Sequence, residues 1–222
     1  MTKTKELLEE LRSVFKGKGL DALLPPIVFA ITNTYLDLTA SSVLAIMVAL
    51  VFGIFRIIKK QVWYYALGGL LGVLIASGFA LYADNATNYF LPGIIGSVGL
   101  TIGTLLTLII GRPLAIYASH LTRGWPLDWF FRRDVKPAYY EVTWMWFFFF
   151  LARTLLQIQL FYQSDVTRFA WINTLLGMPV TIIILIISYV YGIWRLKTLK
   201  GPGVDEYRNH AQPPFKGQTR GF

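Results

Sequence analysis

An arginine near the middle of an apolar run is the first residue whose type and position suggest chemistry. The run Trp144–Phe161 reads WMWFFFFLARTLLQIQLF and has Arg153 near its centre. An arginine at mid-membrane costs about 2.5–3.5 kcal/mol on insertion scales, so we expect its side chain to face protein rather than lipid. A guanidinium in such a place can hold a carboxylate or a phosphate through charge-assisted hydrogen bonds.

No carboxylate of this chain is expected at the depth of Arg153. Glu141 lies more than three turns earlier in the sequence, which is about 18 Å along a helix axis. Amides and hydroxyls in the outer halves of the apolar segments lie closer in depth, so we predict a polar pocket formed by Arg153, Gln157, Asn33, Asn173 and Thr174. Either an anion in this pocket completes the arginine, or amides and carbonyls satisfy it and Arg153 only fixes the helix register.

The residue types on which most enzymes depend are scarce in this chain. It has no cysteine, and its two histidines, His120 and His210, lie outside the apolar segments. Closely spaced acid pairs do not occur in the apolar segments, and the HExxH, P-loop and dinucleotide-binding patterns do not occur in the sequence. A serine nucleophile would need a base beside it. We therefore predict a protein that is not an enzyme and that uses neither a metal nor a cofactor.

The elements that position Arg153 follow from the composition. The chain has 222 residues, of which 55% are hydrophobic and only 15% are charged, whereas soluble domains carry roughly 25% charged residues. A helix needs about 20 apolar residues to cross a bilayer. We predict an all-α polytopic bundle of about six transmembrane helices within a membrane domain, 20–196, with spans at about 20–36, 41–58, 62–83, 89–117, 142–162 and 169–196.

The basic residues predict the orientation of these spans. The net charge is +9, which in a soluble protein would suggest nucleic acid, but here the position of the charges decides otherwise. The two chain ends and alternate connections hold nearly all of the lysines and arginines, whereas Arg168 falls on the opposite side and Arg153 within a span. By the positive-inside rule both termini are expected in the cytoplasm, and no nucleic-acid partner is expected.

The spans group into three hairpins that look alike. Each outer turn holds one acid, namely Asp37, Asp84 or Asp165, and each hairpin ends in a glycine with an arginine close behind. A threefold duplication would explain this pattern. Any helical hairpin with a polar turn and a basic inner end would explain it as well, so both interpretations stay open.

The segments outside the spans suggest contacts with the membrane surface. Residues 1–19 have an apolar face at helical spacing and are expected to form a cytoplasmic amphipathic helix. In the loop 119–140, aromatic residues lie beside cations, and such pairs suit the headgroup layer. We predict either plain interfacial anchoring or contact with an anionic lipid or a partner for Arg123, Trp125, Trp129, Arg132 and Arg133. Residues 197–222 are rich in proline and glycine and are expected to form a flexible cytoplasmic tail.

A pattern of short motifs resembles a known bacterial family. Its members are small polytopic membrane proteins described only as a domain of unknown function. In layout the chain is also similar, more distantly, to the intracellular septation protein A group, inner-membrane proteins associated with division and envelope synthesis. The resemblance implies a plasma-membrane protein of five or six spans without a known activity. The motifs that carry it are Phe90–Gly93, Gly111–Pro113, Arg133-Asp134, Thr143-Trp144, Arg153, Gln157 and Gly177–Pro179.

Together these observations favour a non-enzymatic multi-pass protein of the bacterial plasma membrane that supports envelope or division assembly. The alternative is a small transporter, or an anion- or lipid-binding membrane protein, with its pocket around Arg153. The expected partners are the bilayer, anionic lipids, and membrane proteins or a second copy of the chain.

Overall fold

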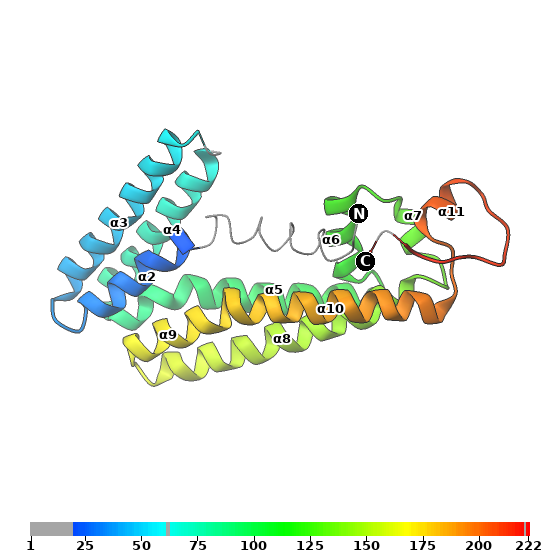
Figure 1. Cartoon of the computed structure of the whole chain (residues 1–222). Coiled ribbons are helices and arrows are strands. Elements are labelled where there is room, and N and C mark those ends of the chain that lie inside the picture. The colour runs from blue at the N-terminus through cyan, green and yellow to red at the C-terminus, as the bar shows by residue number, and fades with distance from the viewer. Residues whose placement is uncertain (1–19, 61–62, 220) are drawn as a thin grey trace. The chain divides into compact units, whose positions relative to one another are not determined.

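A computed structural model describes residues 20–60, 63–219 and 221–222, and these residues form helices and turns without a strand (Figure 1). The all-α expectation is confirmed for them, whereas the predicted amphipathic helix 1–19 lies outside the described residues. In the described part, four helical stretches are long and apolar enough to cross a membrane: Leu38–Ile58, Ala86–Ile109, Lys136–Tyr162 and Val166–Leu199. The other two predicted spans fall on shorter apolar helices, so a total of six spans stays a prediction.

The chain divides into two compact units. Unit 1 comprises the described residues up to Ile95 together with Leu156–Met178, and unit 2 comprises Gly96–Leu155 and Pro179–Phe222. Large apolar side chains lie exposed on the helices of both units, for example Val51 and Leu71 in unit 1 and Phe148 and Ile187 in unit 2. Soluble monomers rarely expose contiguous apolar surface on this scale. These faces therefore suit contact with lipid.

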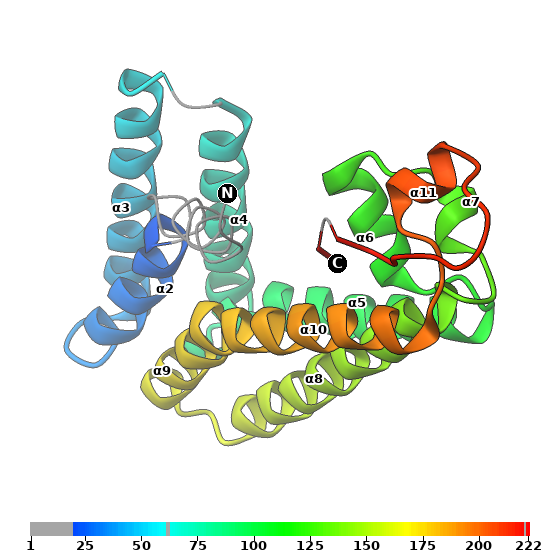
Figure 2. The ribbon, with the colours of Figure 1, turned by 45° about the vertical axis from the view of Figure 1, so that its right-hand side comes forward.

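In unit 1, three helices pack side by side, namely α2 (Leu20–Thr32), α3 (Leu38–Ile58) and α4 (Trp63–Tyr82) (Figure 2). Asp37 starts α3, because its carboxylate accepts a hydrogen bond from the Ala40 amide at 2.8 Å. Small buried side chains such as Ala45 on α3 and Ala80 on α4 let the helix backbones approach closely. The interface between these helices therefore contains small side chains rather than large apolar ones.

An aromatic layer completes unit 1. It joins α2 to the 3₁₀ turn η1 (Ala86–Phe90) and to α9 (Val166–Leu176). The ring of Phe29 stacks on Tyr89 at 4.0 Å between centroids, and Phe90 stacks on Phe169 at 4.4 Å. The Thr34 and Thr167 hydroxyls lie 3.2 Å apart, which brings the turn after α2 to the start of α9.

Unit 2 holds the greater part of three long helices, which run side by side: α5 (Leu91–Ile109) from Gly96 on, α8 (Lys136–Tyr162) up to Leu155, and α10 (Met178–Leu199) from Pro179 on. The buried hydroxyls of Thr101 on α5 and Thr154 on α8 are 3.0 Å apart. The carboxylate of Glu141 on α8 accepts hydrogen bonds from Arg195 and Tyr191 on α10 at 2.8 and 2.7 Å. Polar contacts of this kind align the helices where apolar packing alone would allow sliding.

A small domain, here called the head, sits at one end of these three helices within unit 2. It combines α6 (Leu114–Arg123), α7 (Leu127–Phe130), α11 (Val204–Arg208) and the chain up to Phe222. At its centre is one cluster of buried apolar residues, which consists of Ile116, Trp125, Trp129, Phe130, Val135, Ala138, Tyr139, Val142, Leu196, Val204 and Phe222.

The residues after 196 differ from the flexible tail that the sequence predicts, because they pack against the loop before α8. The Trp129 indole nitrogen donates a hydrogen bond to the Pro202 carbonyl at 2.9 Å. The Phe222 ring stacks on Tyr139 at 4.2 Å between centroids and occupies the space that a side chain at position 192 would need, which Gly192 leaves open. Aromatic burial thus holds a segment whose composition alone suggests disorder.

Two predicted spans are each divided in the structure. The span 89–117 ends as a helix at Ile109, because Gly111 adopts a left-handed φ of 73° and Pro113 follows before α6 begins. The span 169–196 is interrupted at Gly177, between α9 and α10. Hydropathy does not register such breaks, since glycine and proline change the backbone without adding charge.

Candidate functional site

A cavity of about 480 Å³ lies within unit 1 and is called the unit 1 cavity here. Apolar side chains and glycines line most of it, and its polar lining residues are Arg56, Tyr89, Gln157 and Asn173. A mostly apolar cavity with few polar groups is the usual form of a small-molecule site.

Glycines of α4 shape one wall of the cavity. Gly68, Gly69 and Gly72 line it, and a side-chain carbon added at any of the three would meet no atom within 4 Å. Glycine in a helix costs about 1 kcal/mol relative to alanine. The three glycines therefore lower helix propensity and leave space beside the helix that no neighbouring side chain fills.

Hydrogen-bonding groups gather at one end of the cavity. The Gln157 amide nitrogen donates to the Asn173 side-chain oxygen at 2.6 Å, which joins the end of α8 to α9. Gln157 and Tyr89 are only 3% and 4% exposed, yet the Gln157 Oε1 atom and the Tyr89 hydroxyl have no hydrogen-bond partner among the described residues. Buried polar atoms normally have partners, so these two atoms mark a place where a ligand can bind.

The charged group of the cavity lies at its other end. Arg56 belongs to the last turn of α3, and α4 then returns in the opposite direction past Gly68 towards Tyr82. Tyr89 comes after the end of α4, at the far side of that helix from Arg56. The lining residues of α4 run from Gly68 to Ala76, which is about 12 Å at 1.5 Å per residue.

The structure brings together two of the five residues predicted to form a pocket. Gln157 and Asn173 are hydrogen-bonded and line the unit 1 cavity. Asn33 lies in the turn between α2 and α3, and Thr174 lies in the last turn of α9, where its carbonyl accepts a hydrogen bond from Gly177. Neither of these two residues lines the cavity.

Arg153 belongs to unit 2 and is not among the residues that line the cavity. Its side chain is half-buried, and its buried Nε atom has no hydrogen-bond partner within the described part of the chain. Thr154, its neighbour on α8, contacts Thr101. The cavity observed in unit 1 is therefore formed without Arg153 among its lining residues.

Comparison with known families assigns the chain. A family model described as "Protein of unknown function (DUF3159)" matches residues 18–197, well over half of the sequence. The chain belongs to this family. The resemblance to a family of unknown function is thereby confirmed, whereas the likeness to the septation protein A group stays a prediction. No curated protein and no solved structure matches the chain.

The DUF3159 match covers every residue that lines the unit 1 cavity. It stops at residue 197, before α11 and the rest of the segment that closes the head. In this member of the family, the cavity is therefore a feature of the family region, and the head is completed by residues that follow it.

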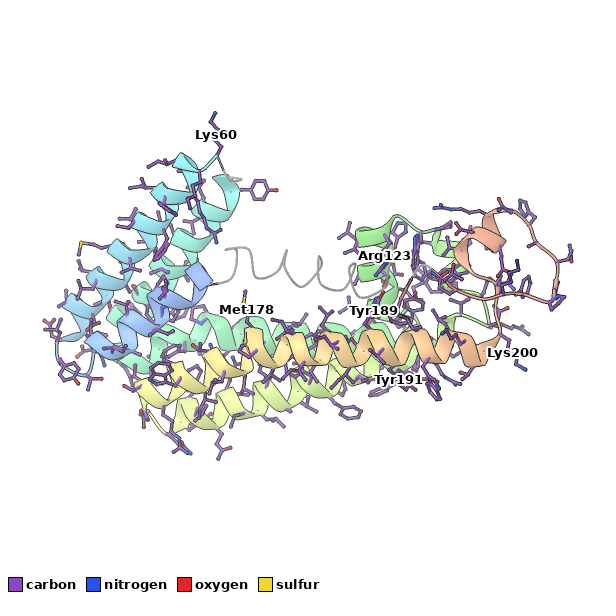
Figure 3. All side chains as sticks on the ribbon, viewed as in Figure 1. Lys60, Arg123, Met178, Tyr189, Tyr191 and Lys200 are labelled. Atoms are coloured by element: carbon purple, nitrogen blue, oxygen red, sulfur yellow. The ribbon has the colours of Figure 1, made fainter. Side chains whose placement is uncertain are left out.

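The loop residues predicted to contact lipid or a partner have two different environments. Trp125 and Trp129 are 5% and 0% exposed and lie in the core of the head, so their rings are not available to headgroups. The Arg123 guanidinium lies over the rings of Trp125 at 5.1 Å and Tyr189 at 5.9 Å (Figure 3). Trp125 thus contacts the arginine, and Trp129 packs within the core of the head.

The other two predicted arginines lie on the surface of the head. Arg132 donates two hydrogen bonds to Asp134, at 2.9 and 2.8 Å, and this guanidinium lowers the pKa of the Asp134 carboxyl below its usual range. The same pairing raises the pKa of Arg132. Arg133 is exposed. The basic surface of the head therefore combines a paired arginine with exposed ones.

Sequence reasoning missed Arg56 and Tyr89 as cavity residues. In the sequence, Arg56 indicates only the basic inner end of a hairpin, and Tyr89 only the start of an apolar span. The glycines of α4 were the available signal, since three of them share one helix face. A metal site is not indicated, because the described residues contain no cluster of three or more His, Cys, Asp or Glu side chains.

Proposed function

We propose that this protein is a non-enzymatic, multi-pass protein of the bacterial plasma membrane that docks an acidic partner protein on its head. Envelope or division assembly is the setting in which such docking would act. The head would lie on the cytoplasmic side, as would both termini. The support for this orientation is the distribution of lysine and arginine along the sequence.

The observation that carries the proposal is the built core of the head. Two segments far apart in sequence meet there, since Trp129 is fully buried and hydrogen-bonded to Pro202. A connection that only linked two membrane helices would not need this packing. A rigid core instead fixes the positions of the side chains on its surface, which lowers the entropy cost of binding a partner.

The surface of the head carries exposed basic side chains. Arg133 follows α7, Arg208 ends α11, and Lys216 lies in the segment that returns towards Phe222. Arg132, which follows α7, packs over the ring of Tyr207 in α11 at 5.9 Å, so these two elements lie close together. Basic groups held on a fixed surface favour encounter with acidic partners and discriminate against basic ones.

A complementation experiment tests this function. The chromosomal gene is deleted and replaced by a triple variant, Arg133→Glu, Arg208→Glu and Lys216→Glu, whose substitutions lie outside the buried core. We expect the variant to accumulate in the membrane at the normal level and yet to leave cell length and sensitivity to envelope-targeting antibiotics uncorrected. The matched control is Arg168→Glu, an exposed arginine of unit 1, which should correct both. Full correction by the triple variant, or a deletion without either defect, would refute the proposal.

A second candidate function is favoured by a separate observation. The sequence suggested a small transporter or an anion- or lipid-binding protein with a pocket around Arg153. The cavity observed in unit 1 contains Gln157 and Asn173 from that predicted set, but it contains Arg56 instead of Arg153. A binding role is therefore better supported for the unit 1 cavity than for the surroundings of Arg153.

A further inference from the structure

The two unpaired polar atoms of the unit 1 cavity indicate what kind of group can bind beside them. The Gln157 Oε1 atom accepts hydrogen bonds, whereas the Tyr89 hydroxyl can donate one. Both side chains line the cavity and are more than nine-tenths buried. A ligand group that both donates and accepts, such as an alcohol hydroxyl, can satisfy either atom.

The middle of the cavity favours an unbranched hydrocarbon. The glycine wall of α4 offers no side chain to hydrogen-bond with, and the other lining residues include apolar ones such as Phe52 of α3 and Pro92 of α5. The lining of α4 extends about 12 Å along the helix axis. An elongated methylene chain can lie along such a wall and gain dispersion contacts with the atoms that line it.

The opposite end of the cavity carries a positive charge. Arg56 lines the cavity at the end of α3, and its guanidinium suits a carboxylate because it can form two parallel hydrogen bonds with it. Arg56 comes before the stretch of α4 that lines the cavity, Gly68 to Ala76, and Tyr89 comes after it, so the two residues bracket this stretch. The cavity therefore offers a cation, an apolar middle and a hydrogen-bonding end in linear order.

We propose that the unit 1 cavity binds a single-chain amphiphile that has a carboxylate at one end and a hydroxyl at the other, that is, an ω-hydroxy fatty acid. The carboxylate lies at Arg56, the methylene chain along the glycines of α4, and the hydroxyl between the Tyr89 and Gln157 side chains. This binding does not depend on the docking role of the head, since every residue involved belongs to unit 1.

The experiment measures binding of three probes to the purified full-length protein in detergent micelles: ω-hydroxydecanoate, decanoate and decanol. The hydroxy acid should bind about fivefold more tightly than decanoate, as expected for one net hydrogen bond. Tyr89→Phe removes one oxygen and keeps the ring that stacks on Phe29, so it should reduce this preference. Arg56→Gln should weaken binding of both acids and leave decanol unchanged.

A matched pair of glycine variants locates the site. Gly72→Phe places a ring in the cavity and should abolish binding of all three probes. Gly78→Phe makes the same change on the same helix, also into open space, but outside the cavity lining, and should bind as the unaltered protein does. Equal affinity for the hydroxy acid and decanoate, or unaltered binding by Gly72→Phe, would overturn the proposal. If Gly72→Phe does not fold, Tyr89→Phe decides, because an unchanged preference for the hydroxy acid would overturn it as well.

Discussion

Replacing Trp129 by phenylalanine should open the head without affecting the membrane helices. The indole nitrogen donates to the Pro202 carbonyl at 2.9 Å inside a fully buried site. Losing the donor leaves that carbonyl unsatisfied, which costs about 1–3 kcal/mol. The smaller ring also leaves a void, for which about 1 kcal/mol is typical of a modest large-to-small change. The sum, about 2–4 kcal/mol, raises the equilibrium population of the open head by about 30- to 700-fold.

Amide hydrogen exchange in lipid nanodiscs measures this opening. The Val204 amide donates to Gln218 Oε1 at 3.1 Å, and the Tyr207 amide donates to the Gly203 carbonyl at 2.9 Å. Both amides should exchange faster by the factor calculated above, since they become accessible when the segment after α10 detaches. The control is Trp194→Phe, the same change at a residue that is 57% exposed. A change of less than about threefold in Trp129→Phe, equal to the control, would refute the view that this tryptophan holds the head together.

Three further predictions concern charged groups. Glu141→Gln and Arg195→Gln should each lower the unfolding temperature, because the ion pair joins α8 to α10. About a third of each side chain is exposed, so the coupling energy from a double-mutant cycle should fall as the salt concentration is raised. A coupling energy of zero would contradict a stabilising role for this pair. The backbone amides of Gly203, Lys216 and Gly217 donate hydrogen bonds to Glu206 and lower its pKa. The stability that Glu206 adds to the head should therefore be complete above the ordinary glutamate pKa of about 4.3 and be lost as the pH falls through the lower folded value. Amide hydrogen exchange of the head in Glu206→Gln should lack this pH dependence. Arg153→Met should raise stability by about 1 kcal/mol or more, because it removes a half-buried cation whose Nε has no partner among the described residues; failure of this variant to accumulate would show that Arg153 is needed for folding.

The sequence was sufficient for the helical class and for the ends of several helices. Apolar runs of the right length predict α3 and α8, and Asp37 and Asp165 are predicted to lie in turns. Both cap a helix, with their carboxylates bonded to the Ala40 and Arg168 amides. Helix capping therefore accounts for the acid in two of the three hairpin turns without a duplication.

The role of Trp129 could not be read from its neighbours in sequence. Aromatic residues that alternate with arginines suit both an interfacial belt and the core of a small domain. The deciding partner is Pro202, 73 residues away, and local pattern carries no information about such a contact. The unit 1 cavity is predictable only in part, because Gly68, Gly69 and Gly72 share one helix face but the residues that complete the cavity lie on other helices.

The two-segment core of the head has a consequence for biosynthesis. Trp129 and Phe130 leave the ribosome before α8, α9 and α10, but the residues that cover them, from Leu196 to Phe222, come afterwards. At about 5–20 residues per second, this interval lasts several seconds. During that time the aromatic side chains lack the residues that bury them in the folded head. Closure of the head therefore follows synthesis of the last membrane helix, and an exposed aromatic loop would distinguish an unfinished chain from a completed one.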